Sequence, residues 1–347
     1  MMNSSLRKLA LIGFGLLFGL FLSLLLLGTA ELGARFFWKP PPPAAQTDYP
    51  DNYYIQDRQG ITKARPSGDY PVAEVRTKTG EKIYEVVYHV DSHGRRITPV
   101  PEHSGRTKHL IFFGCSFMYG EGLQENETLP AQLAARLLDY TPYNYGFHGH
   151  SPAEMLTKIR SGTLPPEVPE REGDLIYLFM DAHISRAIGS LQIVTSWGKN
   201  RPYYRLGPHD EVIRQGDFST GRPVLQWFYE LLAKSRLVRA LRIDLPPVTT
   251  ERHLRLVARL IEESFTAYHH QFPNSRAYLV IYPGTRYGTT LGKTLAAKGI
   301  TVLDYSGLFP DQKPEYILAP EDRHPNARAW QVLSERLATD LKLNEVE

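Results

Sequence analysis

The stretch HLIFFGCSFMYGEG, residues 109–122, begins as an apolar run and ends in a glycine-rich turn that carries Ser116. A short apolar run bounded by glycine is typical of a strand that is buried on both faces. Similar runs recur downstream and alternate with segments of helical periodicity; they span residues 143–146, 175–180, 277–282 and 301–305. Because parallel strands need helical crossovers, this alternation predicts an α/β fold with a five-stranded parallel sheet covered on both faces.

Capping residues predict where the intervening helices begin. Thr128 precedes a leucine stripe, and Thr250 precedes a long amphipathic segment. Ser151 and Glu154 form a capping box, which fixes the start of another helix. A last amphipathic helix carries Trp330 and ends the domain.

Two segments fall outside this alternation. Residues 68–106 are expected to form a small β appendage, because residues 83–90 are rich in β-branched and aromatic side chains. Residues 186–249 form an insertion with an apolar helix over 224–243. An insertion of this size beside a sheet is typical of a lid or a substrate wall. The alternative is a peripheral subdomain that does not contact substrate.

The N-terminal region predicts a membrane anchor. The run 9–27 has no charged residue, and at 1.5 Å per residue it matches a bilayer core of about 30 Å. We therefore expect a cytoplasmic tail at 1–8, a transmembrane helix at 9–30 and a proline-rich linker at 31–67, followed by a domain at 107–345. A cleaved signal peptide ending at Gly28-Thr29-Ala30 is the alternative.

Orientation and partners follow from charge. Two Lys or Arg residues lie on each side of the apolar run, so they do not decide its direction. The short tail favours an N-terminus inside, with the domain outside the cytoplasm and periplasmic if the source is bacterial. The net charge of +3 gives no argument for a nucleic-acid partner. Cys115 is the single cysteine, which excludes an intramolecular disulfide and a multi-cysteine zinc site.

Chemically active side chains follow the predicted strands. Open α/β sheets carry their sites beyond the carboxyl ends of the strands, so these residues are expected to converge at one edge. They include a nucleophile, several bases and several acids. The set is Ser116, His148, His150, Asp181, His183, Glu321, Asp322 and His324.

Three segments resemble the sequence blocks of SGNH hydrolases, a GDSL-like family of serine esterases and acyltransferases. GCSFMYGEG (114–122) is similar to the first block, NYGFHGHS (144–151) to the second and EDRHPN (321–326) to the last. The resemblance covers residues 107–345. It implies a flavodoxin-like three-layer α/β/α fold and ester chemistry that needs no cofactor and no metal.

The resemblance also implies roles for individual residues. Ser116 would attack the ester carbonyl, and His324 would accept its proton. Asp322 would orient the imidazole, with Glu321 as the competing candidate. The backbone N–H groups of Ser116 and Gly149 would form the oxyanion hole.

Two positions depart from the family pattern. Cys115 stands where an Asp usually precedes the nucleophile; we expect a buried core residue there rather than a second nucleophile. Asp181 stands where an Asn usually donates to the oxyanion, and an ionised carboxylate cannot donate. Either Asp181 is protonated, or His183 donates instead, or the hole is weaker. A simple pairing of Asp181 with His183 is the structural alternative.

The sequence therefore predicts a membrane-anchored esterase or O-acyltransferase that acts, through an acyl-enzyme, on an acylated carbohydrate, polysaccharide or lipid. The acyl group is expected to be acetyl. One alternative is an inactive protein that binds polysaccharide or scaffolds an export complex. The other is a metal-dependent hydrolase that uses His148, His150, His183 and His324. In the favoured interpretation His148 and His150 are pocket walls.

Overall fold

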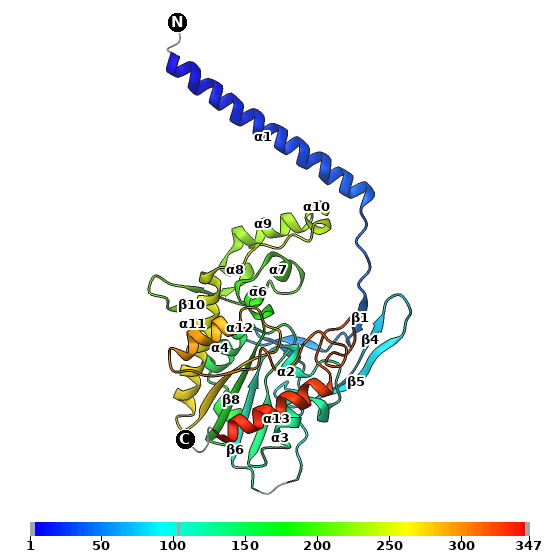
Figure 1. Ribbon diagram of the computed structural model, residues 1–347, viewed down its shortest axis with the longest axis vertical. Coiled ribbons are helices and arrows are strands. Elements are labelled where there is room, and N and C mark those ends of the chain that lie inside the picture. Colours follow the sequence, from blue (N-terminus) through cyan, green and yellow to red (C-terminus); the bar gives the residue numbers. More distant parts are fainter. Residues whose placement is uncertain (1–3, 103–104, 344–347) are drawn as a thin grey trace.

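The computed structural model describes residues 4–102 and 105–343 (Figure 1). Residues 1–3 of the expected cytoplasmic tail lie outside the described residues. So do residues 103–104 of the expected appendage and residues 344–347, which include the last two positions of the expected domain.

The central sheet has the five parallel strands that the sequence predicts, and their order is β12-β11-β8-β6-β7. The strands are β6 (Lys108–Phe113), β7 (Tyr140–Asn144), β8 (Glu172–Phe179), β11 (Arg276–Ile281) and β12 (Thr301–Asp304). From β6 the chain first adds β7 on one side and then β8, β11 and β12 on the other. This reversal leaves a crevice beyond the carboxyl ends of β6 and β8, where the loops diverge.

Helices cover both faces of the sheet (Figure 1). On one face the core includes side chains of α4 (Pro152–Arg160), α11 (Glu251–Gln271) and α12 (Gly288–Ala296). On the other face it includes side chains of α3 (Leu129–Ala134) and α13 (Ala327–Leu343). The predicted fold class, helices around a parallel sheet, is thus confirmed.

The predicted caps are present at three of these helices. The Thr128 side chain accepts from the Ala131 N–H at the start of α3. Ser151 and Glu154 form the expected capping box of α4, and Thr250 caps α11. The shorter helices are α2 (Ser116–Tyr119), the 3-10 turn η1 (Glu125–Glu127), α5 (Leu164–Glu167), α6 (Ala182–Ile188), α7 (Leu191–Ser196) and α8 (Phe218–Gly221).

The β appendage is larger than residues 68–106. Strand β1 (Ala45–Asp48), from the expected linker, joins β4 (Gly68–Arg76) and β5 (Lys82–Val90) in an antiparallel sheet. A second hairpin pairs β2 (Tyr54–Gln56) with β3 (Thr62–Ala64). The appendage core contains Tyr119 and Phe147, which belong to the loops after β6 and β7. The appendage therefore packs directly on the segments that follow the carboxyl ends of β6 and β7.

The insertion consists of a hairpin and several helices. Strands β9 (Pro202–Leu206) and β10 (Val212–Asp217) pair in antiparallel fashion. The single helix expected over 224–243 is instead two helices, α9 (Pro223–Ala233) and α10 (Arg236–Ala240). The break occurs because the Ser235 side chain accepts from the Val238 N–H and so caps a new helix.

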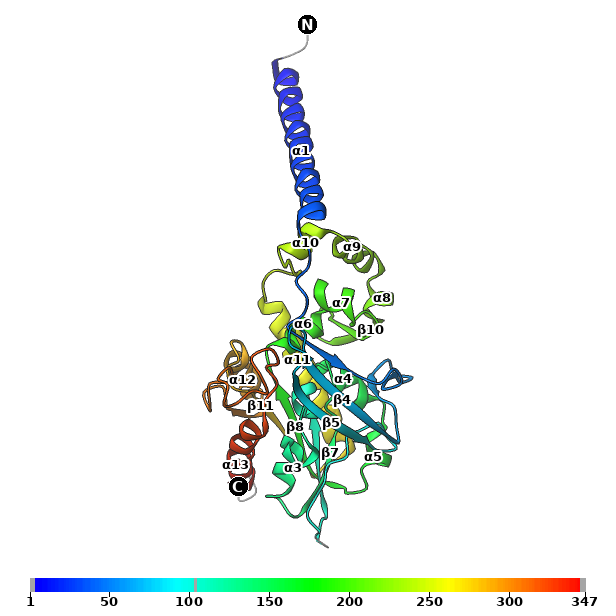
Figure 2. The ribbon, with the colours of Figure 1, turned by 90° about the vertical axis from the view of Figure 1, so that its right-hand side faces the viewer.

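The N-terminal helix α1 (Ser4–Phe37) projects away from the rest of the molecule (Figures 1 and 2). Within it, Leu11–Phe37 is long and apolar enough to cross a membrane, and no part of its apolar window is buried by the protein. The helix continues seven residues beyond position 30, where the anchor was expected to end.

Candidate active site

Ser116 lies at the start of α2, immediately beyond the carboxyl end of β6, and is largely buried. The turn that presents it is packed tightly against the second block. A Cβ at Gly146 would lie 2.7 Å from the Cβ of Met118, which is closer than carbon atoms normally approach. Glycine is therefore required for the loop after β7 to lie against the serine-bearing turn.

His324 and Asp322 reach Ser116 from the loop before α13. His324 Nε2 lies 2.8 Å from Ser116 Oγ, and His324 Nδ1 lies 2.5 Å from Asp322 Oδ1. The same Asp322 oxygen accepts from the His324 backbone N–H at 3.0 Å. A turn in which Leu318 donates to the His324 carbonyl at 2.9 Å holds this loop in place. The arrangement matches nucleophile, base and orienting acid in a serine hydrolase.

The charges of this trio reinforce one another. Burial raises the pKa of Asp322, but the hydrogen bond and charge of His324 outweigh burial and lower the pKa below its ordinary value. Burial lowers the pKa of His324, but Asp322 and the nearby Glu121 outweigh burial and raise it. Asp322 is therefore ionised at neutral pH and stabilises a protonated His324, the form that follows proton transfer from serine.

Glu321 does not contact His324. Its carboxylate instead accepts from Arg76 Nε of β4 at 3.2 Å. Of the two acids proposed from the sequence, Asp322 is the one that the structure brings to the imidazole.

The appendage adds Glu74 to the site, a residue that the sequence did not single out. Glu74 is a buried residue of β4, its Oε1 accepts from Thr47, and its carboxyl group lies beside Asp322. Its Oε2 is buried and has no hydrogen-bond partner among the described residues, so ionisation of Glu74 would leave an unsatisfied charge there. Burial and then Asp322 raise the pKa of Glu74 to about 7. Below about pH 7, Glu74 is therefore protonated and lies uncharged beside the ionised Asp322.

A second buried acid, Glu121, follows the α2 turn and was also missed. It forms an ion pair with His148 Nδ1 and accepts from Tyr49 and, at 3.0 Å, from Tyr84. Burial raises the pKa of Glu121, but His148 and His324 outweigh burial and lower it to about 2. His148 also lies 2.9 Å from the Tyr53 hydroxyl. His148 therefore belongs to an appendage-facing network rather than contacting Ser116.

The expected oxyanion donors differ in their surroundings. Gly149 has a φ of +70°, which glycine adopts without strain, and no hydrogen bond from its N–H or that of Ser116 to another described residue is formed. The Asp181 carboxylate accepts from the backbone N–H groups of Arg286 at 2.6 Å and Tyr287 at 3.1 Å. Asp181 is thus an acceptor that secures the start of α12, and it presents no donor to an oxyanion.

His183 and Cys115 face each other below the site. His183 Nδ1 lies 2.7 Å from the Tyr177 hydroxyl. Burial raises the pKa of the Cys115 thiol, but His183 lies close enough to Cys115 to lower it. His183 therefore does not pair with Asp181. Cys115 is buried, with its Sγ 3.4 Å from Met180 Sδ, as expected for a core residue.

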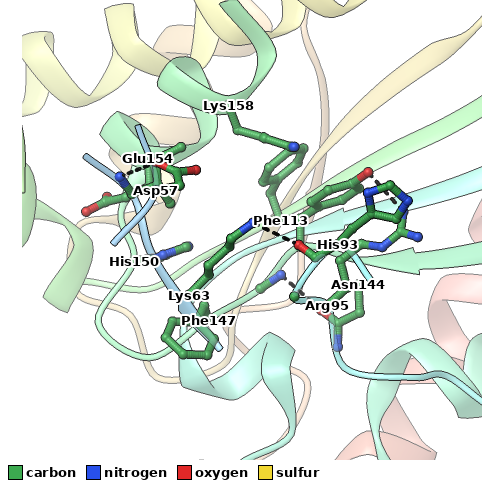
Figure 3. A pocket seen from close by; sticks show the side chains of 14 residues that line it. Asp57, Lys63, His93, Arg95, Phe113, Asn144, Phe147, His150, Glu154 and Lys158 are labelled. Atoms are coloured by element: carbon green, nitrogen blue, oxygen red, sulfur yellow. Dashed lines mark hydrogen bonds between the residues drawn. The ribbon is translucent and has the colours of Figure 1, made fainter. Parts of the chain in front are cut away.

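His150 lies beside a small cavity behind the second block (Figure 3). Its Nε2 lies 2.7 Å from the Thr62 carbonyl oxygen. The cavity, of about 40 Å³, has polar walls that include Lys63, Glu154 and Lys158, and Ser116 is not among its lining residues. It has room for ordered water rather than for a substrate.

The four histidines proposed as metal ligands thus have four different sets of partners. Within residues 4–102 and 105–343, no group of three or more His, Cys, Asp or Glu side chains is placed to hold a metal ion.

No family model and no curated protein matches this chain. Among solved structures it is similar to a lipolytic protein of the G-D-S-L family from Veillonella parvula, at 13% identity over 66% of this chain and 94% of the other, with a TM-score of 0.36. It is also similar to an acetyl xylan esterase from Butyrivibrio proteoclasticus, at 12% identity over 71% of this chain and 66% of the other, with a TM-score of 0.39. A third similar structure is a carbohydrate esterase family 2 enzyme from Corynascus thermopiles, at 11% identity over 85% of this chain and 85% of the other, with a TM-score of 0.36. Similarity at this level leaves the family and activity to be argued from this chain's own side chains.

The proton on Glu74 predicts a pH-dependent stability. A pKa of about 7 in the folded chain, above the ordinary 4.5, means that the folded state binds more protons between these values and loses stability as pH rises through them. Glu74→Gln keeps a donor without the charge. Relative to the wild type, we expect this variant to gain at least about 1 kcal/mol of unfolding free energy between pH 5 and pH 8.

Denaturant unfolding at the two pH values measures this difference. Glu85→Gln, which removes an exposed carboxylate from the neighbouring strand β5, is the matched control and is expected to show no such gain. Equal pH dependence in the wild type and Glu74→Gln would show that Glu74 is ionised in the folded chain.

Proposed function

We propose that this chain is a membrane-anchored serine hydrolase or O-acyltransferase of the SGNH type, with its catalytic domain outside the cytoplasm. The observation that carries the proposal is the continuous hydrogen-bonded chain from Ser116 through His324 to Asp322. Ser116 and His324 are 208 residues apart in sequence. Local structure alone does not bring such residues together, and their order is the one that nucleophilic catalysis on an ester needs.

In the proposed mechanism, Ser116 Oγ attacks the ester carbonyl carbon while its proton moves to His324 Nε2. Asp322 holds the Nδ1 proton, fixes the tautomer and stabilises the imidazolium. The tetrahedral oxyanion accepts from the N–H groups of Ser116 and Gly149, and His324 returns its proton to the departing alcohol. Water or a sugar hydroxyl then attacks the acyl-Ser116 ester, and His324 again transfers the proton.

The oxyanion hole in this proposal has two backbone donors. It lacks a third donor, because Asp181 stands where an asparagine would supply a side-chain amide. Loss of one donor raises the barrier by about 2.7–4 kcal/mol in a serine protease. We therefore expect turnover slower than that of an enzyme with three donors, not an inactive protein. Asp181 is engaged by the N–H groups of Arg286 and Tyr287, and this observation also favours the alternative, an inactive protein that binds polysaccharide.

A pocket of about 550 Å³ beside Gly149 supports a carbohydrate substrate. Its wall includes the half-exposed Trp197 ring, with the Arg201 guanidinium 4.8 Å from the ring centroid. Arg201 is itself fixed by Glu154 at 3.1 Å. An aromatic face beside fixed polar groups suits a sugar ring, which stacks on the face and hydrogen bonds at its edges.

Covalent labelling tests the nucleophile. A fluorophosphonate probe reacts with a serine that a neighbouring base activates, so we expect the wild-type chain to be labelled and Ser116→Ala to be unlabelled. Cys115→Ala is the matched control. It should still be labelled, because the wild-type thiol is buried and is not the site at which the probe reacts. Wild-type labelling that survives in Ser116→Ala would contradict the proposal, and an unlabelled wild type would favour the inactive alternative.

The two adjacent acids provide a second test. Asp322→Asn removes the charge that supports His324, so the probe should react far more slowly, by up to about 10⁴-fold as in serine proteases. Glu321→Gln breaks only the contact with Arg76 and should react at nearly the wild-type rate. Initial labelling rates measure both, and a larger effect at Glu321 would reassign the acid.

The labelling rate should also depend on pH. The base must be neutral, and the pKa of His324 lies above its ordinary value of 6.5. We therefore expect the rate to be lost as pH falls, with a midpoint above 6.5. In Asp322→Asn the midpoint should move down, since the largest influence raising that pKa is gone. An unchanged midpoint would mean that another group controls the reaction.

A further inference from the structure

The helix α9 exposes its apolar face to solvent, whereas a surface helix normally buries that face. Its apolar side chains at helical spacing point to solvent: Val224 is 79% exposed, Trp227 64% and Leu231 50%. The side chains that it buries against the insertion are Gln226 and Tyr229. An amphipathic helix normally buries its apolar stripe, so this stripe is directed at something outside the folded domain.

The apolar face continues past α9. Phe228 on the same helix is 42% exposed, and Leu241 and Val248 are about two-thirds exposed in the segment that follows α10. Solvent-facing apolar residues scattered singly need no explanation, but here four of the six lie on α9 and the other two follow α10. We call these residues the α9–α10 face: Val224, Trp227, Phe228, Leu231, Leu241 and Val248.

The N-terminal helix shows where this face lies. The Glu31 carboxylate of α1 accepts from the Ser235 hydroxyl at 2.6 Å and from the N–H groups of Arg236 and Leu237, each at 3.0 Å. Glu31 therefore caps the first turn of α10. Glu31 follows the apolar run 9–27 by four residues, which is about 6 Å along a helix. If that run spans the bilayer, the start of α10 lies at headgroup depth.

The two views of the molecule agree with this placement. In Figures 1 and 2, α9 and α10 form a layer between the end of α1 and the rest of the domain. The charge of this layer is also suitable. Residues 222–248, the stretch that carries this face, contain five Lys or Arg residues and two acidic residues, Glu230 and Asp244. Basic residues near a surface of anionic lipid each contribute about 1 kcal/mol of attraction.

We propose that the α9–α10 face lies in the membrane interface, with its apolar side chains among the lipid headgroups and upper acyl chains and its basic residues beside lipid phosphates. A helix with an apolar face, Trp and flanking basic residues is the kind that lies in the interface plane. The domain is then held to the bilayer at two places, α1 and the insertion, and its orientation is fixed. This inference rests on the proposed membrane anchor and is independent of the catalytic proposal.

Site-specific labelling in lipid tests the inference. The full-length chain is placed in nanodiscs of phosphatidylcholine and phosphatidylglycerol, and an environment-sensitive fluorophore is attached at Val224→Cys or Leu231→Cys. Gln331→Cys, an exposed position on α13, is the matched control, and Leu20→Cys reports on the anchor. Cys115 is buried, so unmodified chain gives the background labelling. Nitroxide-bearing lipid serves as the quencher.

We expect severalfold stronger quenching at 224 and 231 than at 331. Quenching at Leu20→Cys without quenching at 224 and 231 would overturn the inference and leave the anchor intact. If no position is quenched, including Leu20→Cys, the proposed membrane anchor is itself contradicted. A blue-shifted but unquenched fluorophore at 224 and 231 would mean that a second copy or another protein covers the face, which also overturns the inference.

Discussion

The proposed function of this chain depends on the hydrogen bond between Ser116 Oγ and His324 Nε2, at 2.8 Å. Neither partner is reactive alone: a serine hydroxyl is a weak nucleophile, and an imidazole without an acceptor is free to turn. The contact exists because α13 packs on the sheet to which β6 belongs, so the loop before α13 meets the turn after β6. The parallel sheet thus acts as the frame that holds the two groups together.

The appendage completes the site rather than decorating it. Glu74 lies beside Asp322, Arg76 binds the competing Glu321, and Arg96 donates to the carbonyls of Gly120 and Leu123 just after the serine turn. Three residues of one small β segment therefore fix the acid, remove its competitor and brace the nucleophile turn. Because the segment also follows α1 in sequence, a short and ordered stretch of chain links that helix to the residues around Ser116.

Much of this could be predicted from sequence because the deciding signals are local. Buried strands appear as apolar runs, and Thr128, Ser151 and Thr250 mark helix starts by side-chain chemistry. Ser116 and His324 were found because each stands at the end of an element that points to one edge of the sheet. Glu74 and Glu121 were missed because their roles come from contacts between segments that no local pattern links.

Two further differences have physical reasons. Asp181 occupies the position of an oxyanion donor along the chain, but its carboxylate is drawn to the free N–H groups at the start of α12. Apolar periodicity predicted helical structure within 224–243, where α9 and α10 lie, but the same periodicity fits a helix that faces a protein core or a membrane. Only the fold shows which way the apolar stripe points.

The central claim is that Ser116 carries the acyl group during turnover. The most direct measurement is an acid quench of the chain during reaction with an activated acetyl ester, followed by peptide mass spectrometry. From the proposed acyl-Ser116 intermediate we expect one acetyl group on Ser116, bound as an oxygen ester and absent from Ser116→Ala. An acetyl group on Cys115, recognised by the thioester's faster cleavage with hydroxylamine, or turnover with no covalent intermediate, would contradict it.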